Sequence, residues 1–456
     1  MPDQREPADV VIVGAGASGT LLASRLLRGG SDRGPVVLIE RSGGEGQGVA
    51  YSTTEPSHVL NIPAAGMSAV HDEPNHFVDW LRHSGIQAGP DDFIPRSMYG
   101  RYLRSLLDAP GGRADLLRMR DEVVKARPSD RGVIVELAGG STIHTRHIIL
   151  AIGNSRPRTP SFMKPALSSR YIEDPWSATS LAQIEPTDRV LLVGTGLTAV
   201  DVMLTLESRG HSATIHAVSR HGLLPQVHRL PPERPSSLRA LPALPSPLTT
   251  SHLVRWVRSE IRTAEAEGAD WRDVINDLRP WTQSLWMELS QSQRRVFLER
   301  VARFWSVVRH RMAPRVGEMI ERMRSTGQLI VMGARPRVER RGDGFRVGLQ
   351  SSEGSRDLRV NWIVNCTGPE LDPARSEEPL VCSLLSSGAT RRDPLGLGFD
   401  CTADGRLIDA SGAANRRLWA IGSLRVGSLW ESTSVPEIRE QAAALALELD
   451  RESALV

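Results

Sequence analysis

Cysteine and long apolar runs are scarce in this chain, and each scarcity excludes a class of protein. The three cysteines, Cys366, Cys382 and Cys401, form no C-x-x-C pair, so a thiol–disulfide reductase with a local redox dithiol is not expected. No stretch approaches the roughly 18 apolar residues of a membrane-spanning helix, and no apolar signal segment precedes the first strand. We therefore expect a cytoplasmic protein without a membrane partner.

Lysine is also nearly absent, because all but two of the 56 basic residues are arginine. The 53 acidic residues almost balance them, leaving a net charge of +3. A nucleic-acid-binding protein normally carries a concentrated basic face or a known binding module. The arginines at 294, 295, 309 and 311 have the simpler interpretation of a solvated helix face. We expect no nucleic-acid partner, and the sequence contains no pattern that predicts a metal site.

Two glycine-rich turns, each between an apolar strand and a helix, dominate the 456 residues. The first lies at residues 11–19 and the second at residues 190–199. In such turns the first glycine permits a tight bend, the second lets the backbone approach a pyrophosphate, and the third small residue lets the helix pack on the strand. Phosphates then lie at the helix N-terminus, where free N–H groups favour anions. The positions concerned are Gly14, Gly16 and Gly19, then Gly194, Gly196 and Ala199.

The residue that ends the next strand predicts which dinucleotide each turn binds. After the first turn, the strand at 36–39 ends in Glu40, whose carboxylate is suited to both ribose hydroxyls of FAD or NAD. After the second turn, the strand at 213–218 ends in Ser219 and Arg220 without an acid. A hydroxyl and a guanidinium are suited to the 2′-phosphate of NADPH. The simpler alternatives are that Glu40 is a solvated residue at a strand end and that Arg220 is an ordinary strand-end arginine, neither of them binding a nucleotide.

The chain repeats one plan twice, which is more specific than either turn alone. A hairpin at 132–145 leads to a buried strand at 148–154, and strands at 345–349, 358–360 and 362–369 follow the same order. We predict an α/β fold with two Rossmann-like dinucleotide-binding domains, the second inserted in the first. The predicted boundaries are 1–155 with 370–456 for FAD, 156–224 with 326–369 for NADPH, and 225–325 for a proline-rich connector and a helical insertion.

Five tryptophans in the insertion, at 256, 271, 281, 286 and 305, are interpreted as core residues of that segment. An aromatic substrate pocket is the alternative. In the first domain, small residues at 46–53 and 58–69 suit close approach to a flat flavin ring. A third glycine-ended strand, at 418–423, is followed by N-terminal helix signals near residue 435. The dipole of that helix would stabilise negative charge on a reduced flavin.

These segments resemble bacterial FAD/NAD(P)-binding proteins related to flavin monooxygenases. The likeness extends over nearly the whole chain and includes residues 48–52, 61–64, 95–100, 151–154 and 429–437. Among the relatives it suggests N-hydroxylases, Baeyer–Villiger enzymes and a flavin-dependent urate hydroxylase. Two departures stand out: residues 171–176 lack the usual Phe-x-Gly-x-x-x-His run, and the third strand ends in Gly422-Ser423 where many flavoproteins have Gly-Asp.

The resemblance implies further cofactor-binding residues around the two turns. They are Ala17, Ser18, Arg41, Tyr51, Asn61, Met67, Val124, Gly153, Thr198, Gly422 and Ser434. We expect an NADPH-dependent FAD monooxygenase that forms a C4a-hydroperoxyflavin and oxygenates a small nitrogen-containing or heteroaromatic metabolite. Because the cofactor carries the chemistry, the sequence names no catalytic residue. Its expected partners are the substrate and molecular oxygen, with a homo-oligomer as a possible assembly.

Two alternatives use the same nucleotide motifs. A flavin reductase or dehydrogenase would pass electrons to another acceptor without oxygen insertion. A redox-sensing protein would bind the dinucleotide and show no turnover.

Overall fold

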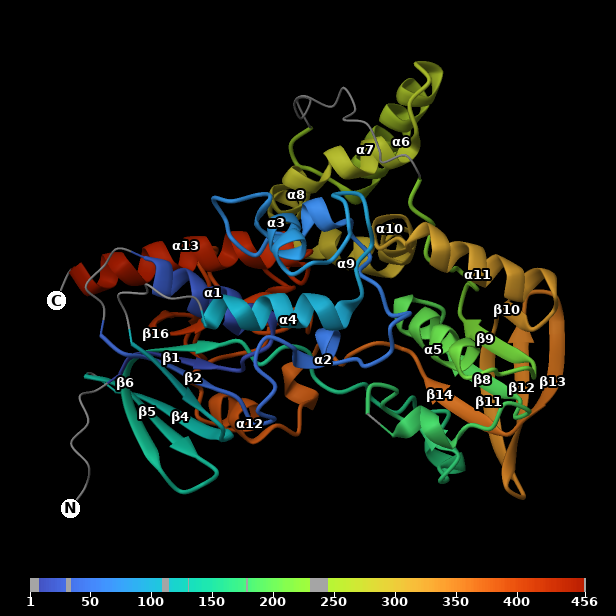
Figure 1. The fold of residues 1–456 in the computed structure, drawn as a ribbon, viewed down its shortest axis with the longest axis horizontal. Coiled ribbons are helices and arrows are strands. Elements are labelled where there is room, and N and C mark those ends of the chain that lie inside the picture. The colour runs from blue at the N-terminus through green and yellow to red at the C-terminus, as the bar shows by residue number, and fades with distance from the viewer. Residues whose placement is uncertain are drawn as a thin grey trace. The chain divides into compact units, whose positions relative to one another are not determined.

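The computed structural model describes residues 8–29, 34–108, 115–129, 131–177, 179–229 and 245–454. The chain divides into two compact units (Figure 1). The first contains the chain up to Thr54, Ile62–Ser155, and the chain from Glu370 onward. The second contains Arg156–Pro369 and also the short segment Glu55–Asn61. The prolines of the expected connector at 231, 232, 235 and 242 lie outside the described residues.

The first unit is built on an eight-stranded sheet with the order β15-β16-β6-β1-β2-β3, extended by β5 and β4 through antiparallel pairing to β6. The strands are β1 (Ala8–Val13), β2 (Val36–Ile39), β3 (Leu116–Met119), β4 (Val123–Ser129), β5 (Gly132–Leu137), β6 (Thr142–Leu150), β15 (Arg406–Ile408) and β16 (Ala414–Ala420). The helices are α1 (Ala17–Arg28), α2 (Gly48–Tyr51), α3 (His76–His83), α4 (Arg96–Leu107), α12 (Pro379–Ser386) and α13 (Val435–Ala454), with short turns η1 (Ala64–Gly66), η5 (Pro373–Arg375) and η6 (Gly422–Arg425).

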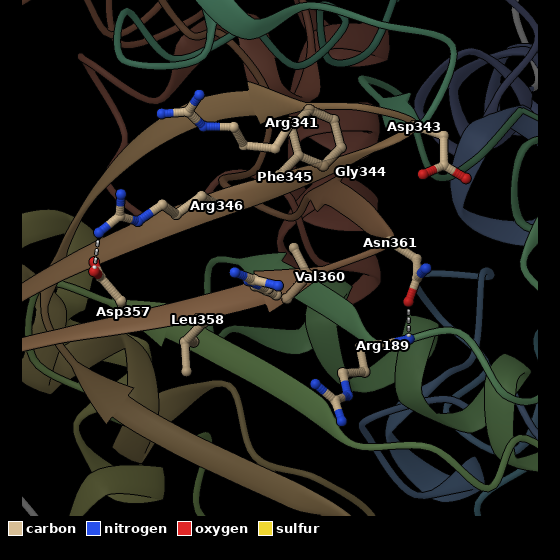
Figure 2. Close-up of a pocket in the computed structure, with 11 residues that line it drawn as sticks. Arg189, Arg341, Asp343, Gly344, Phe345, Arg346, Asp357, Leu358, Val360 and Asn361 are labelled. Atoms are coloured by element: carbon tan, nitrogen blue, oxygen red, sulfur yellow. Dashed lines mark hydrogen bonds and ion pairs between the residues drawn. The ribbon is translucent and has the colours of Figure 1, made fainter.

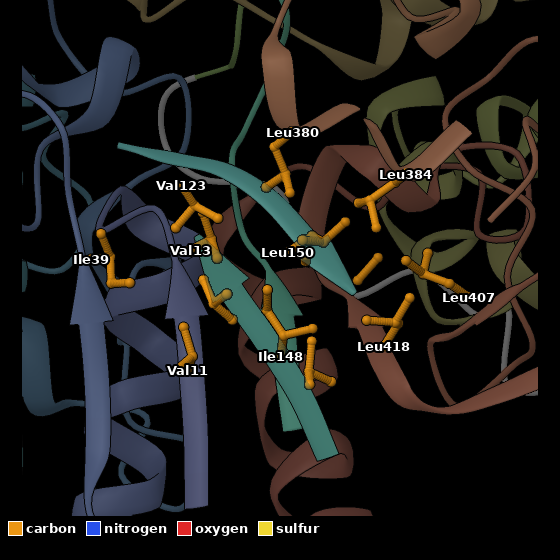
Figure 3. Close-up of a cluster of buried hydrophobic side chains, with 14 of the residues drawn as sticks. Val11, Val13, Ile39, Val123, Ile148, Leu150, Leu380, Leu384, Leu407 and Leu418 are labelled. Carbon is orange, nitrogen blue, oxygen red and sulfur yellow. The ribbon is translucent and has the colours of Figure 1, made fainter. Parts of the chain in front are cut away.

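The neighbouring strands β1 and β2 are buried along their whole length because both faces of the sheet are covered, and Asp9 is their one polar residue. Every residue of β1 is buried. One face supplies Val11, Val13, Ile148 and Leu150 to a core that α12 closes with Leu380 and Leu384 (Figure 3). On helix α1, seven of twelve residues are buried, and the helix packs against α13 and α4. The parallel strands β1, β2 and β6 therefore end at the same edge of the sheet, where Val13 pairs with Ile39 and Leu150.

The second unit repeats this plan on a five-stranded parallel sheet, β10-β9-β8-β14-β7, with a separate antiparallel sheet, β11-β12-β13. The strands are β7 (Tyr171–Ile172), β8 (Val190–Val193), β9 (Ile215–Ser219), β10 (Leu329–Gly333), β11 (Arg335–Arg341), β12 (Gly344–Ser351), β13 (Gly354–Val360) and β14 (Trp362–Asn365). The helices are α5 (Leu197–Ser208), α6 (Thr250–Ala266), α7 (Trp271–Asp277), α8 (Thr282–Glu288), α9 (Gln291–Arg300), α10 (Ala302–Arg309) and α11 (Pro314–Ser325), with η2 (Lys164–Ala166), η3 (Ser180–Gln183) and η4 (Arg279–Trp281).

The predicted fold class is confirmed, with differences in detail. The expected second hairpin strand and the buried strand after it are one continuous strand, β6, which pairs antiparallel with β5 at its start and parallel with β1 at its end. Because a strand can pair on two edges at once, the change of partner requires no break in the chain. The buried strands end earlier than expected, at Leu150, Asn365 and Ala420.

The tryptophans of the insertion correct the expectation of a tryptophan core. Only Trp286 is fully buried, at 2% exposure, while the other four are partly exposed. The ring of Trp271 lies under the guanidinium of Arg272, 4.4 Å away, and Trp256 donates its indole N–H to Glu260. Trp256 and Trp271 thus contact charged side chains and do not lie in an apolar core. In the described residues no helix is long and apolar enough to cross a membrane.

Candidate functional site: two glycine-rich turns

The first turn requires two of its glycines for the packing of the chain itself. Gly14 has a φ of +99°, a conformation that residues with a Cβ rarely adopt. A Cβ at Gly14 would lie 2.5 Å from the carbonyl oxygen of Ala151, and one at Gly19 would lie 1.9 Å from that of Gly14. Without a side chain, the backbone at Gly14 lies close to Ala151, which follows β6, and the backbone at Gly19 on α1 lies close to Gly14 in the turn. Any side chain at either position would force the backbone apart.

Gly16 differs, because nothing among the described residues requires a glycine there. Its φ of −68° is open to any residue, and its Cβ would meet only the Cα of Gly48, at an ordinary 3.5 Å. Gly16 is also the N-cap of α1 and offers no side chain to cap the first-turn N–H groups, which belong to Ala17, Ser18 and Gly19. A bare helix N-terminus beside a glycine that leaves room for a ligand fits a pyrophosphate.

The second turn has the same division of roles. Gly194 has a φ of +121° and its Cβ would lie 2.2 Å from the carbonyl oxygen of Cys366. Gly196 has a φ of −81° and caps α5 without a side chain. No heavy atom of the described residues lies within 4 Å of a Cβ built there. Thr198 lies in the first turn of α5 and is partly exposed. The turn therefore also suits a dinucleotide.

Glu40 directly follows β2, and its carboxylate is held by three hydrogen bonds. One oxygen accepts the backbone N–H of Ala15 at 2.9 Å, and the other accepts the N–H and hydroxyl of Ser42 at 2.9 and 2.8 Å. The next side chain, Arg41, binds Glu378 with an N–O distance of 2.7 Å. The hydrogen bond to Glu378 raises the pKa of the Arg41 guanidinium. Arg41 thus joins the segment after β2 to Glu378, just before α12, within the first unit.

At the end of β9, Ser219 and Arg220 differ in their surroundings. The Ser219 hydroxyl lies 2.9 Å from the Thr195 hydroxyl and accepts the N–H of Gly222 at 3.0 Å. It therefore shapes the turn. The Arg220 side chain is exposed and makes no hydrogen bond or ion pair with any described residue.

The residues expected around the flavin ring fall into both units. Tyr51, on α2, lies 4.9 Å from the ring of Tyr99, which donates its hydroxyl to the backbone oxygen of Met67. Desolvation raises the pKa of Tyr51 to about 12. Asn61, in contrast, belongs to the second unit, where its backbone oxygen lies 3.0 Å from the ring nitrogen of His228. Met67 therefore belongs to the first unit and Asn61 to the second.

Three further expected residues lie in the first unit. Val124 follows the buried Val123 on β4 and is partly buried. Gly153 follows β6 in a left-handed conformation with a φ of +73°. The Ser434 hydroxyl, just before α13, donates to the carboxylate of Glu437.

Sequence reasoning missed Gln441, whose buried amide joins two segments near the first turn. Its Oε1 accepts the N–H of Gly422 at 3.0 Å, and its Nε2 donates to the backbone oxygen of Ser432 at 3.1 Å. Gly422 has a φ of +79°, and its Cβ would lie 2.4 Å from the hydroxyl of Ser18 on α1. The signal in the sequence is one polar residue among the buried positions 438–449 of α13.

We expect Gln441→Leu to lower the free energy of unfolding by about 1–3 kcal/mol, because it leaves the buried N–H of Gly422 and the oxygen of Ser432 unpaired. Urea unfolding measures the change. Leu447→Gln, at a position of the same helix that is 53% exposed, serves as the control and should change stability by less than about 0.5 kcal/mol. Equal effects of the two substitutions would contradict the bridging role.

The three cysteines do not form a redox pair. Cys366 and Cys401 are buried and Cys382 is exposed, and all three are free thiols. Burial raises the pKa of Cys366 and Cys401, the latter to about 12. We expect a thiol-reactive dye at pH 8 to titrate one thiol per native chain and three after denaturation, because thiolates are the reactive form. Rapid titration of a second native thiol would show that one of the buried cysteines is accessible.

A groove of about 860 Å³ lies on the small antiparallel sheet of the second unit, outside both turns (Figure 2). Arg346 is joined there to Asp357, and the side-chain oxygen of Asn361 to the backbone of Arg189 (Figure 2). None of its lining residues belongs to the expected site. Among the described residues no three His, Cys, Asp or Glu side chains gather as a candidate metal site.

Comparison with known families and structures agrees with this geometry. Residues 11–155 match a family model described as FAD-NAD(P)-binding. Residues 93–229 match one described as L-lysine 6-monooxygenase/L-ornithine 5-monooxygenase. Each match covers about a third of the chain, and no curated protein matches it.

Solved structures match nearly the whole chain at low identity. An ornithine N-hydroxylase from Kutzneria sp. 744 is 17% identical with a TM-score of 0.67, and the match covers 98% of this chain and 100% of that one. The fold is that of the flavin-dependent N-hydroxylases. An L-lysine 6-monooxygenase from Pseudomonas syringae is 18% identical (TM-score 0.65, 97% and 99% covered). A cadaverine monooxygenase from Erwinia amylovora is 12% identical (TM-score 0.66, 98% and 95% covered). The expected resemblance to flavin monooxygenases is confirmed, and of the three expected relatives these are the N-hydroxylases.

Proposed function

We propose that this chain is an FAD-dependent, NADPH-using monooxygenase that hydroxylates a small nitrogen-containing metabolite, with primary amines as the first candidates. The observation that carries the proposal is the paired design of the turns. In both, the first glycine is required by the packing of the chain, whereas the second is free to take a side chain and leaves room for a ligand. The matched structures support amines because they are described as ornithine, lysine and cadaverine enzymes.

In this proposal the first unit binds FAD. The N–H groups of Ala17 and Ser18 at the start of α1 would hold the pyrophosphate, and Glu40 would accept the ribose hydroxyls. Reduced FAD supplies the chemistry by activating molecular oxygen. The protein orients the reactants and excludes water, and no protein nucleophile is required. NADPH would bind the second turn, and Arg220, which directly follows β9, would hold its 2′-phosphate.

The test starts with the absorption spectrum of the purified protein, followed by anaerobic reduction with NADPH. Oxygen uptake is then measured with ornithine, lysine and cadaverine, together with the mass of the product. The expected result is a flavin spectrum, reduction by NADPH, and a product heavier by one oxygen atom, with water as the second product. Reduction and oxygen uptake without an oxygenated amine would favour the reductase. Stoichiometric cofactor binding without turnover would favour the redox sensor.

A further inference from the structure

The helical insertion is joined by backbone hydrogen bonds to the segment that follows β9. The N–H of Gln226 donates to the oxygen of Val307 on α10 at 2.9 Å, and the N–H of Met312 donates to the oxygen of Gln226 at 2.7 Å. His228 then donates to Met312 at 2.9 Å. These bonds lie within one compact unit. Helix α10 is therefore a fixed neighbour of the strand end that carries Arg220.

Three side chains of this region face one another. The ring of His221, directly after Arg220, lies 6.5 Å from the ring of Phe304 on α10. The guanidinium of Arg303 lies 4.7 Å from the same phenylalanine ring. Phe304 is 49% exposed, so it does not serve the core and instead supports the arginine at the surface.

Neither Arg303 nor Arg220 has an acidic partner among the described residues. Arg303 donates from Nη1 to the backbone oxygen of Glu299 at 2.7 Å, and its buried Nε has no partner among the described residues. Partial desolvation lowers the pKa of His221, and the positive charges of Arg303 and Arg220 lower it further. Arg229 and Arg272, by contrast, are paired with Asp273 and Asp270, each at 3.1 Å. Two guanidinium groups near one imidazole, with no carboxylate of the described residues bound to either, have the charge that suits a polyvalent anion.

We propose that Arg303 of the insertion and Arg220, which directly follows β9, together bind the phosphomonoester on the adenosine ribose of NADPH, so that the helical insertion determines the preference for NADPH over NADH. This inference rests on the proposed function of the second turn. Ser219 has a different role, because its hydroxyl is bonded to Thr195 and Gly222. The insertion is then part of the nucleotide site.

The test compares the binding of 2′,5′-ADP and 5′-AMP to the full-length protein by calorimetry, since these two ligands differ only in the 2′-phosphate. Arg303→Ala is expected to weaken the binding of 2′,5′-ADP about tenfold and to leave the affinity for 5′-AMP unchanged. Arg303→Lys should restore part of the loss. Arg300→Ala is the matched control. Arg300 is exposed on the adjacent helix α9, and its substitution removes the same positive charge. In the double variant Arg220→Ala/Arg303→Ala, the affinity for 2′,5′-ADP should fall by a smaller factor than the product of the two single-variant factors, because both groups bind one phosphate.

The outcomes separate this inference from the function on which it rests. If the unmodified protein binds neither ligand, the NADPH site and the inference both fail. If it binds 2′,5′-ADP and Arg303→Ala behaves as Arg300→Ala does, the inference alone fails. An equal loss of affinity for both ligands would contradict the inference, because it would mean that Arg303 maintains the structure of the site and does not bind the 2′-phosphate. A circular-dichroism melting curve would show whether the variant is folded.

Discussion

Gly16→Val is expected to give a folded protein that purifies without FAD, whereas Gly14→Ala is expected to unfold or to melt far below the unmodified chain. At Gly16 the backbone conformation accepts a side chain, and a Cβ meets only the Cα of Gly48 at 3.5 Å. The valine methyl groups would instead occupy the place where a pyrophosphate approaches the start of α1.

At Gly14 the reason for the loss is internal to the chain. The φ of +99° costs about 1–3 kcal/mol for a residue with a Cβ, and the Cβ would lie 2.5 Å from the oxygen of Ala151. The measurements are the flavin absorbance per mole of protein and the melting temperature by circular dichroism. A yellow, fully loaded Gly16→Val protein would contradict the assignment of FAD to the first turn.

The same comparison applies to the second turn. Gly196→Val should leave the melting temperature and the bound FAD nearly unchanged and abolish reduction by NADPH. Gly194→Ala should destabilise the protein, because its Cβ would lie 2.2 Å from the oxygen of Cys366. Loss of FAD from Gly196→Val would show that the two turns do not serve separate nucleotides.

The second large effect is expected for Arg220→Ala, which should strongly weaken the binding of NADPH and change the binding of NADH little. A charge-assisted contact between arginine and phosphate contributes about 1.5–3 kcal/mol, or roughly one to two decades in affinity. Only NADPH carries the 2′-phosphate. The measurement is the apparent affinity for each nucleotide during anaerobic flavin reduction.

Arg209→Ala is the matched control, since Arg209 is an exposed arginine at the end of α5 in the same unit. It should change neither affinity by more than about twofold, as expected for a solvated charge. Equal losses of NADPH and NADH affinity in Arg220→Ala would contradict the phosphate-binding role and would mean that Arg220 is an ordinary strand-end arginine.

The sequence by itself determined the features that depend on neighbouring residues. Tight turns between strand and helix require glycines at fixed spacing, and Gly14, Gly19 and Gly194 have the contacts that this spacing predicts. Buried parallel strands require apolar runs, and β1 and β8 are buried throughout. The position of Glu40 at the end of β2 followed from the same local pattern. For these reasons the fold class and both nucleotide turns could be predicted.

Only the tertiary structure decided which distant segments meet. Asn61 and Met67 are six residues apart, but the chain crosses between units there, because His58 is buried against the backbone oxygen of Asp201 on α5. Gln441 joins Gly422 to Ser432, and Arg303 lies near His221, through packing across long stretches of sequence. A side chain's partners at such separations depend on how whole elements pack, and local propensity and periodicity carry no record of that packing.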